Sequence, residues 1–451
     1  MRTPYRFALA AIAAIVPALA SAATYYVDRS HPQASDVNPG TEAAPWKSIQ
    51  HATTLLAPGD TVYVKEGTYP ERVAVTRSGT PGREIVLAAY PGHAVTIDGS
   101  GIEVPEYTGL FDIREVTDVR IRGFHVTNAG PHPTSTGIQV EDAQRITIEA
   151  NHTSKTASSG ILIWSSRDVL VEGNEIESPM TRGAESRNEC LTVGRSEHFE
   201  IRDNVVRDNP GQRGEGICLK DGSAFGSAHH NHVHHVPAVG IYVDAWTEST
   251  HDIDVYSNRV HDVRGNGIVC ASEQGGRLER IRVFNNLSYS NDVLGFDLSD
   301  CCIAQHPMAD VQIVNNTFWN NGVTWGGGLA VSHAQWTGLV IRNNAVAGNL
   351  SFEMAAESID LAAASVDHNL VGATHGYPGE FCGTECRPGD PLWIAPAAGD
   401  FHVSPGSRAI DAGSSSGAPR FDFDGRPRPA GAAVDIGAFE YPAPRRRMVR
   451  R

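Results

Sequence analysis

The sequence predicts an all-β fold, a single-stranded right-handed parallel β-helix, and three observations support that prediction. Short segments of alternating polar and apolar residues recur at intervals of 23 to 30 residues. Most repeats contain a second alternating segment that opens on glycine, such as GILIWSS from Gly160 and GIYVDAW from Gly240. No segment between them has a helical period long enough to cross between strands. Repeats of this length, built of strands and turns, indicate a solenoid with one coil per repeat.

A ladder of asparagines marks one corner of the coils. Stacked amide side chains form hydrogen bonds along the stack. We therefore expect these asparagines to hold neighbouring coils in register, and we assign them no chemistry. Each comes directly after the first strand of its repeat; they are Asn151, Asn174, Asn204, Asn231, Asn258, Asn286, Asn316, Asn344 and Asn369.

The chain begins with the features of a secretory signal over residues 1–22. Arg2 and Arg6 precede an apolar run from Phe7 to Leu19, and Ala20-Ser21-Ala22 supplies a small-residue cleavage site. The run is too short to span a bilayer, and no later segment is apolar enough to do so. We expect a secreted or periplasmic protein with no membrane span.

The rest of the chain divides into four regions. A strand at Thr24–Asp28 and an amphipathic helix within Pro45–Ala57 are expected to cover the first coil, whose core would otherwise be exposed. Residues 373–441 break the repeat and are rich in Gly, Pro, Ala and Ser, and we expect them to wrap the other end of the coils. The regions are a cap with the first strands (23–104), the coils (105–372), a wrapping segment (373–441) and a basic tail (442–451).

The glycine-opened strands determine which side chains point inward. Successive side chains of a strand point to opposite faces, so the two apolar residues that flank each central position share one face. Stacked over many coils, these pairs form a continuous core. They are Ile138/Val140, Ile161/Ile163, Leu191/Val193, Ile217/Leu219, Ile241/Val243, Ile268/Cys270, Phe296/Leu298 and Leu329/Val331.

Charge and cysteine content limit the function classes. The chain has 37 basic and 52 acidic residues, a net charge of −15, and this balance argues against a nucleic-acid partner. We expect a monomer. Seven cysteines are an odd number for an exported protein. Cys382 and Cys386 are close enough in sequence to close a small loop, and for the others free thiols and disulfides both stay open.

The outer face of the glycine-opened strands carries a strip of charged and aromatic residues. Lys220 and Asp244 fall at the same position on adjacent coils, so their Cα atoms should lie about 5 Å apart. Carboxylates gather toward one end of the strip, where they would raise one another's pKa or hold a cation. Aromatic side chains beside them are suited to stack on sugar rings, and a groove across coils suits an extended polymer. The strip contains Trp164, Arg195, Lys220, Asp221, Tyr242, Asp244, Trp246, Glu273, Asp297 and Asp300.

Structural explanations compete with functional ones for parts of this pattern. Any β-helix exposes charges, and one surface Lys–Asp contact contributes little, but five carboxylates of the strip gather within four coils. In the run His229–His235, Val233 aligns with Val260 and points inward, so the histidines point in different directions. His234 and His261 share an outward column. We interpret this run as a corner stack rather than a metal pair.

Both ends of the mature chain resemble the pectate-lyase-like superfamily of exported β-helix proteins that act on polysaccharides. The resemblance rests on the opening TYYVDRSHPQASDVNPGTEAAPWKSIQHATTLLAPGDTVYVKEGTYPERV and on the closing segments DFHVSPGSRAIDAG and DFDGRPRPAGAAVDIGAFEY. Together with the coils, these segments cover nearly all of the mature chain. The resemblance implies the fold, secretion and a polysaccharide partner.

One local segment resembles a catalytic one. Glu215-Gly-Ile-Cys-Leu-Lys220 is similar to the acid-then-lysine segment of alginate lyases and chondroitinase B. The resemblance implies that Glu215 helps to hold Ca²⁺ and that Lys220 is the Brønsted base. On the following coil those enzymes have an arginine where this chain has Asp244, which puts their acid partner in doubt here.

These observations predict β-elimination on an acidic, uronate-containing polysaccharide. The reaction removes a proton beside a carboxylate, and calcium held by carboxylates would neutralise the developing charge and lower the pKa of a nearby lysine. Two alternatives stay open: hydrolysis by paired carboxylates, favoured by the acid at position 244, and non-catalytic glycan binding at a cell surface. The expected roles are catalysis by Lys220, Asp244 and Glu273, substrate binding by Trp164, Arg195, Tyr242 and Trp246, and calcium binding by Glu215, Asp221, Asp297 and Asp300.

Overall fold

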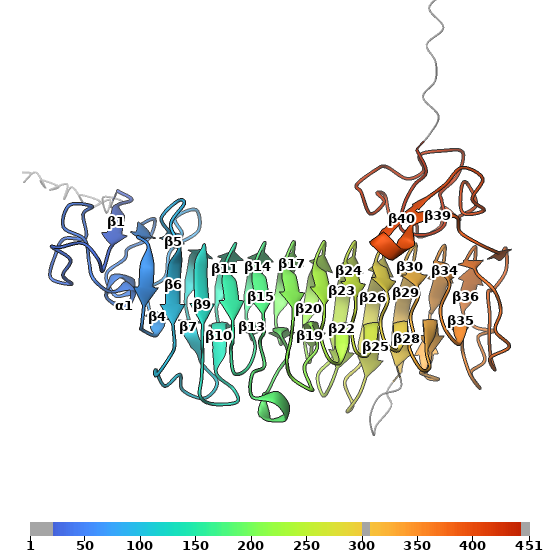
Figure 1. Ribbon diagram of the computed structural model, residues 1–451, viewed down its shortest axis with the longest axis horizontal. Coiled ribbons are helices and arrows are strands. Elements are labelled where there is room, and N and C mark those ends of the chain that lie inside the picture. The colour runs from blue at the N-terminus through green and yellow to red at the C-terminus, as the bar shows by residue number, and fades with distance from the viewer. Residues whose placement is uncertain (1–20, 300–306, 443–451) are drawn as a thin grey trace, which may run out of the picture.

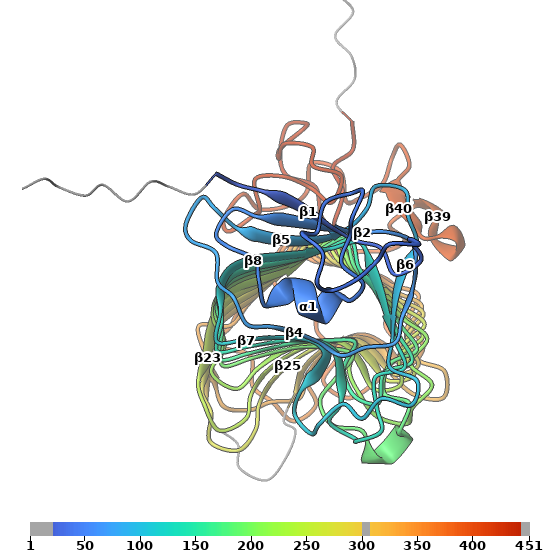
Figure 2. The same cartoon turned by 90° about the vertical axis from the view of Figure 1, so that its left-hand side faces the viewer.

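The computed structural model describes residues 21–299 and 307–442 as a right-handed parallel β-solenoid (Figure 1). Figure 2 looks along its axis and shows the coils stacked behind one another around a common core. This confirms the predicted fold. No helix in these two ranges is long and apolar enough to cross a membrane. Most of the predicted signal and of the basic tail lies outside the described residues, and so do Asp300, Cys301 and Cys302.

The first long sheet contains the strands that precede the ladder asparagines. It has 14 strands, and neighbouring strands pair in parallel. In stacking order they are β1 (Thr24–Val27), β2 (Thr61–Val64), β5 (Ile85–Ala89), β8 (Thr117–Arg122), β11 (Gln144–Glu149), β14 (Arg167–Glu172), β17 (Glu197–Arg202), β20 (Ala224–His229), β23 (Thr250–Tyr256), β26 (Leu278–Phe284), β29 (Met308–Val314), β33 (Val340–Arg342) and β36 (Ser365–Asp367), with β32 (Trp336–Thr337) beside β29.

The second long sheet contains the glycine-opened strands and has 11 members. Every apolar pair predicted to point inward from it is buried, at 0 to 1% exposure. Its strands are β4 (Val73–Val75), β7 (Gly109–Arg114), β10 (Thr136–Glu141), β13 (Ile161–Trp164), β16 (Leu191–Gly194), β19 (Ile217–Lys220), β22 (Val239–Ala245), β25 (Asn266–Ser272), β28 (Leu294–Ser299), β31 (Gly327–Val331) and β35 (Phe352–Ala355).

The third long sheet closes each coil with a short strand and has 13 members. They are β3 (Gly67–Tyr69), β6 (Val95–Asp98), β9 (Phe124–Thr127), β12 (His152–Ser154), β15 (Glu175–Glu177), β18 (Val205–Arg207), β21 (His232–His234), β24 (Arg259–His261), β27 (Leu287–Tyr289), β30 (Thr317–Trp319), β34 (Ala345–Ala347), β37 (Leu370–Val371) and β38 (Arg387–Pro388). Outside the three sheets lie α1 (Ile49–Thr53), the 3₁₀ turns η1 (Gly183–Glu185) and η2 (Pro396–Ala398), and the antiparallel pair β39 (Trp393–Ala395) and β40 (Asp400–Val403).

The asparagine ladder forms as predicted. Asn258 is representative: its Nδ2 donates to the carbonyl of Ala228 at 2.9 Å and to Oδ1 of Asn286 at 3.0 Å. Its own Oδ1 accepts the backbone N–H of Asn231 at 3.0 Å. The same pattern links the successive ladder asparagines from Asn151 to Asn369. Each coil is therefore bonded to the next through buried amides.

A short helix covers the N-terminal end of the core. Helix α1 occupies only Ile49–Thr53 of the predicted Pro45–Ala57; Ser48 caps its start and Thr54 caps its end. Figure 2 shows α1 across the open end of the coils. The three sheets continue on the N-terminal side of residue 105, so β2 to β6, assigned to the cap from sequence, pair with the coils.

The C-terminal segment lies on the flank of the solenoid as well as at its end. β38 adds a last strand to the third sheet. The chain then returns along the coils (Figure 1), where Asn285 donates to the carbonyl of Phe421 and Asn315 to the carbonyl of Gly437. Phe401 and Phe439 pack against β27 there. Residues 373–441, which we expected to wrap the end of the solenoid, thus also contact its flank.

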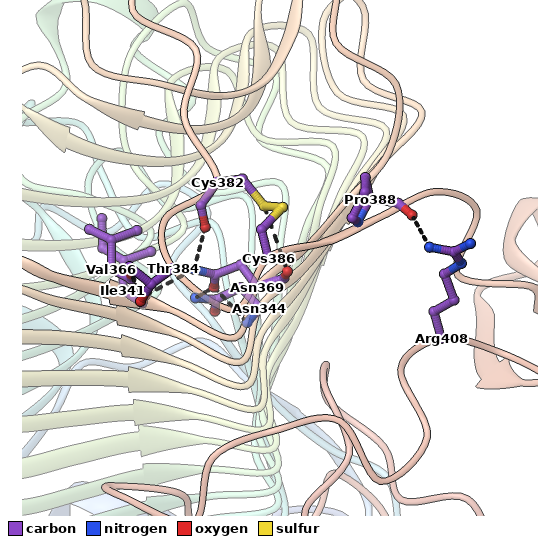
Figure 3. The surroundings of a disulfide bond; sticks show 9 residues. All are labelled: Ile341, Asn344, Val366, Asn369, Cys382, Thr384, Cys386, Pro388 and Arg408. Carbon is purple, nitrogen blue, oxygen red and sulfur yellow. Dashed lines mark hydrogen bonds between the residues drawn. A yellow bond between two sulfur atoms is a disulfide. The ribbon is translucent and has the colours of Figure 1, made fainter.

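A disulfide fastens the end of the asparagine ladder. Cys382 and Cys386 are bonded, and the carbonyl of Cys382 accepts a hydrogen bond from Asn369, the last ladder asparagine, at 3.4 Å (Figure 3). Cys190, Cys218 and Cys270 are free and buried. The small loop that the sequence suggested is thus closed.

Removing one rung of the ladder should destabilise the coils. Asn258→Ala would leave the N–H of Asn231 and the carbonyl of Ala228 buried without a partner, so we expect a loss of about 2–4 kcal/mol in the free energy of unfolding, measured by denaturant titration. Gln335→Ala removes an exposed amide at a position without a left-handed backbone and should change stability by less than about 0.5 kcal/mol. Equal losses in both variants would contradict a stabilising role for the ladder.

Candidate active site

A pocket of about 490 Å³ lies on the outer face of the second sheet. Strands β19 and β22 and the residue after β25 supply its floor. The long turns before β16 and β19 supply its rim, including Asn188, Gln212 and Gly214. The pocket therefore forms where the predicted outward strip is bordered by the turns before β16 and β19, which are longer than the turns before β13 and β22 on the neighbouring coils.

Strand alternation places the functional side chains in this pocket. Ile217 and Leu219 point into the core, so Cys218 and Lys220 point outward. The register pairs Cys218 with Tyr242 and Leu219 with Val243. The next residues in this register are Lys220 and Asp244, which therefore lie side by side. The predicted neighbourhood of Lys220 and Asp244 is thus present in the parallel register.

Lys220 is bound to a carboxylate that the sequence analysis did not select. Its Nζ donates to Oε1 of Glu189 at 2.7 Å, and Glu189 also accepts from Oγ1 of Thr192 at 2.9 Å. Burial alone would lower the pKa of Lys220, but Glu189 and then Asp244 outweigh burial and raise it above its usual value. We expected bound calcium to lower the pKa of this lysine, and that expectation stays a prediction. The sequence did hold a signal for Glu189: in the parallel register it takes the same position as Glu215, the acid selected on the next coil, and a cysteine takes the place of the opening glycine.

The carboxyl groups around Lys220 are crowded and largely buried. Asp244 is 5% exposed, and among the described residues its Oδ1 has no hydrogen-bond partner. Burial raises the pKa of Asp244 well above its usual value, opposed by Lys220 and reinforced by Glu273. Burial and the charge of Glu189 raise the pKa of Glu215 to about 7. Several carboxyls of this pocket therefore favour the protonated form.

Tyr242 occupies a different role from the predicted one. It is 9% exposed, and its ring packs with Cys218, Val269 and Ala271 instead of offering an open face to a sugar. Its hydroxyl donates to Oε1 of Glu273, whose pKa is raised by burial. Tyr242 thus holds Glu273 at the edge of the pocket.

Two tryptophans flank the pocket. The ring of Trp164 lies over Gly194 of the next coil, where a Cβ would be only 2.1 Å from Cζ3, so the absence of a side chain there makes room for the ring. The guanidinium of Arg195 lies 5.7 Å from the centroid of Trp164. Trp246 is 46% exposed on the opposite side. Both tryptophans line the pocket.

The three predicted calcium ligands that the structure describes, Glu215, Asp221 and Asp297, do not converge on one point. Asp221 accepts the backbone N–H groups of Thr247 and Glu248 at 2.9 and 2.8 Å, and so holds the loop that carries Trp246. Asp297 lies outside the pocket and accepts from Oγ of Ser332 at 2.7 Å. Of the four, Glu215 and Asp221 line the pocket, and Asp300 is outside the described residues.

Groups of converging metal-ligand atoms lie elsewhere on the described part of the chain. Within residues 21–299 and 307–442, three His, Cys, Asp or Glu donor atoms lie within 4.8 Å of one another in two groups, Asp208/His234/His235 and His152/Glu175/Glu177. Neither group is in the pocket. As arranged here, the pocket does not fit the oxygen-rich shell that calcium requires.

Stability should depend on pH through Glu215. Its pKa is raised from 4.5 to about 7 on folding, so between these values only the unfolded chain loses the proton and stability falls as pH rises. Below about pH 4.5 Glu215 is protonated in both the folded and the unfolded protein, so it does not affect the free energy of unfolding. Above about pH 7 the decrease in that free energy is complete. In chelator, Glu215→Gln should therefore stabilise the protein at pH 8 by on the order of 2 kcal/mol and by almost nothing at pH 4.5.

The exposed Glu248→Gln serves as the matched control, because its side chain contacts Arg195 at the surface. Denaturant titrations at both pH values measure the effect. A stabilisation by Glu215→Gln that is the same at both pH values would contradict the raised pKa.

Comparisons with known proteins agree with this fold. Over 377 residues the chain is 27% identical to YwoF of Bacillus subtilis (strain 168), an uncharacterized protein, covering 75% of this chain and 78% of that one. An 89-residue stretch is 40% identical to pectate lyase PEL9 of Emericella nidulans, covering 19% of this chain and 21% of that enzyme.

Solved structures show the same architecture. The crystal structure of pectate lyase Pel9A matches with a TM-score of 0.57 and 17% identity, covering 94% of this chain and 97% of that one. The complex of XylC with xylose matches with a TM-score of 0.61 and 12% identity, covering 92% and 98%. At these identities the structures establish the fold alone. Residues 25–344 match the family model described as Pel9A-like, right handed beta helix region, and the chain belongs to that family.

Proposed function

We propose that this protein is an exported carbohydrate-active enzyme that cleaves a uronate-containing polysaccharide by β-elimination, with Lys220 as the base. The observation that carries the proposal is the placement of Lys220. It is the one lysine among the described residues that line the pocket, it lies on the floor between carboxylates, and a tryptophan stands on either side. The family membership supports an activity on polysaccharides.

The reaction requires a base at the proton beside the uronate carboxylate. Lys220 is anchored by the 2.7 Å hydrogen bond to Glu189, so its Nζ has a defined position at the floor. The same hydrogen bond offers a path by which the ammonium can pass a proton to a carboxylate before it accepts the substrate proton. Because the pKa of Lys220 is raised, the neutral amine becomes populated only as pH rises, and the rate should increase toward alkaline pH.

Two arginines at the rim support an acidic substrate. Arg187 and Arg213 line the pocket and are exposed, and neither side chain makes an ion pair or hydrogen bond with another residue that the structure describes. Arg195, by contrast, lies 3.6 Å from Asp221. Guanidinium groups bind carboxylates well. In this proposal Arg187 and Arg213 neutralise substrate carboxylates that the acidic floor would repel.

The tryptophans support a sugar polymer. Trp164 and Trp246 present ring faces at the two sides of the pocket, and stacked sugars would span the floor between them. The sequence resemblance implies calcium, so the activity assay described below compares calcium with chelator. No step of the proposed reaction passes through calcium.

A second candidate is hydrolysis by the carboxyls of the same pocket. Asp244 and Glu273 both line it, and the pKa of each is raised by burial. A carboxyl that stays protonated near neutral pH is what the general acid of a glycosidase requires. This candidate needs no lysine base, so the two reactions are separable by mutation and by product.

Substituting the proposed base should abolish elimination. We expect Lys220→Ala to lower the rate by about 100-fold or more, because general bases contribute about 10²–10⁴ to rates. The measurement is ultraviolet absorbance of unsaturated product from pectate, alginate and chondroitin, each with calcium or chelator at pH 7 to 10. Lys155→Ala, which alters an exposed lysine after β12, is the control and should keep full activity.

The competing outcomes are distinct. New reducing ends without absorbance, lost in Asp244→Asn but kept in Lys220→Ala, would replace elimination with hydrolysis. Absorbance that persists unchanged in Lys220→Ala would remove the lysine from the mechanism. No product from any polymer would contradict both enzyme proposals and favour glycan binding without catalysis.

Removing the rim arginines should weaken substrate binding more than turnover. Losing one carboxylate contact costs about 1.4 kcal/mol or more, so Arg187→Ala and Arg213→Ala should each raise KM about tenfold with a smaller change in kcat. The effect should shrink in high salt. Arg182→Ala is the matched control, because Arg182 is in the same turn as Arg187 and is already paired with Glu185 at 2.8 Å. An unchanged KM in both rim variants would show that the arginines do not contact the substrate.

A further inference from the structure

Three metal-binding side chains meet on the outer corner that follows the third sheet. His234 ends β21, His235 follows it, and Asp208 follows β18 on the neighbouring coil. Nδ1 of His234 lies 2.7 Å from Nδ1 of His235, and Nδ1 of His235 lies 3.4 Å from Oδ1 of Asp208. Donor atoms of all three lie within 4.8 Å of one another.

The backbone explains why these atoms converge. His235 has a left-handed conformation, with φ of 53°, which turns its ring back toward the preceding side chain. The next coil has the same corner at His261–Asp262, where the imidazole Nδ1 lies 2.7 Å from a carboxylate of Asp262. In the His234–His235 pair both side chains are imidazoles, and the nearby carboxylate is that of Asp208 on the preceding coil. The corner thus brings together two nitrogen donors and one oxygen donor.

We propose that Asp208, His234 and His235 bind a borderline divalent transition-metal ion, with Zn²⁺ as the reference ion, and thereby link two adjacent coils. Two imidazoles and a carboxylate are a common zinc ligand set, and water would complete the tetrahedron. Calcium requires an oxygen-rich shell and is excluded by this set. The proposal does not depend on the proposed enzymatic function.

The distances suit the ion after a small adjustment. Zn–N bonds of about 2.0–2.1 Å place donor atoms about 3.3 Å apart in a tetrahedral site. The 3.4 Å separation of His235 and Asp208 already matches, whereas the two imidazoles must part by roughly 0.6 Å. The side chain of His235 is 57% exposed, so it is free to make this movement. Without metal, one Nδ1–H donates to the other Nδ1, and the ion would replace that proton.

Nearby cations set a limit on affinity. Arg207 binds Oδ2 of Asp208 and leaves Oδ1 for the metal. His232 and His261 lie close together, with Nε2 atoms 2.7 Å apart, but Nδ1 of His261 is bonded to Asp262 and no carboxylate joins the two Nε2 atoms within the described part of the chain. We therefore expect one ion per chain, with a dissociation constant in the micromolar range.

The other convergent group is a weaker candidate. Glu175 and Glu177 lie beside His152, but Arg207 binds Glu175 at 2.7 Å and approaches Glu177 at 3.3 Å. An ion there would have to displace the guanidinium from both carboxylates. We make no proposal for that group.

Calorimetric titration of untagged, chelator-treated mature protein tests the site. We expect binding of one Zn²⁺, a rise in Tm with Zn²⁺, and no comparable response to Ca²⁺ at this site. His235→Ala and Asp208→Asn should weaken Zn²⁺ binding about tenfold or more and remove the Tm shift. The Co²⁺-loaded protein should show a visible absorption band typical of tetrahedral coordination, which His235→Ala removes.

A neighbouring pair supplies the matched control. His229 and His230 have the same corner, with Nδ1 atoms 2.8 Å apart, but Glu200 bonds to the opposite ring nitrogen of His229, and among the described residues this pair is not part of a three-donor group within 4.8 Å. The His229→Ala/His230→Ala variant should bind Zn²⁺ as the parent does. No Zn²⁺ binding to the parent, unchanged binding in His235→Ala, or an equal loss in the control variant would each overturn the proposal. Matching circular dichroism spectra ensure that every variant is folded.

Discussion

The structure depends on the fixed register between adjacent coils. Parallel strands pair residue by residue, and the buried asparagines add a second set of bonds, because each amide satisfies a backbone carbonyl and a backbone N–H of the preceding coil. A slip of one residue would leave these buried groups unpaired and turn the apolar pairs outward. Register is therefore specified at every coil, and any side chain that faces outward has a defined neighbour on the next coil.

The pocket follows from that constraint together with local turn length. Alternation sends Lys220 and Asp244 outward side by side, and longer turns on the neighbouring coils bring Glu189 and the rim arginines over them. These turns exclude water from this part of the outer face, and the resulting burial raises the pKa of its carboxyl groups. A regular scaffold thus acquires a chemically distinct region through two turns.

The same geometry produces the histidine corner. There the left-handed residue after a short strand folds one ring against the next, and stacking supplies Asp208 from the coil before. The pocket and this corner have different chemistry: carboxyl groups surround a lysine in the pocket, whereas two imidazoles meet one carboxylate at the corner.

The sequence by itself determined the repeat, the inward pairs, the ladder and the adjacency of Lys220 and Asp244, because each follows from a period of two within a strand and a constant period between strands. It did not determine what the long turns cover. Glu189 reaches Lys220, Tyr242 turns its hydroxyl to Glu273, and Asp221 binds a loop, whereas Asp297 remains outside the pocket. These outcomes depend on turn paths and side-chain packing between coils, which have no period, and only the tertiary structure decides them.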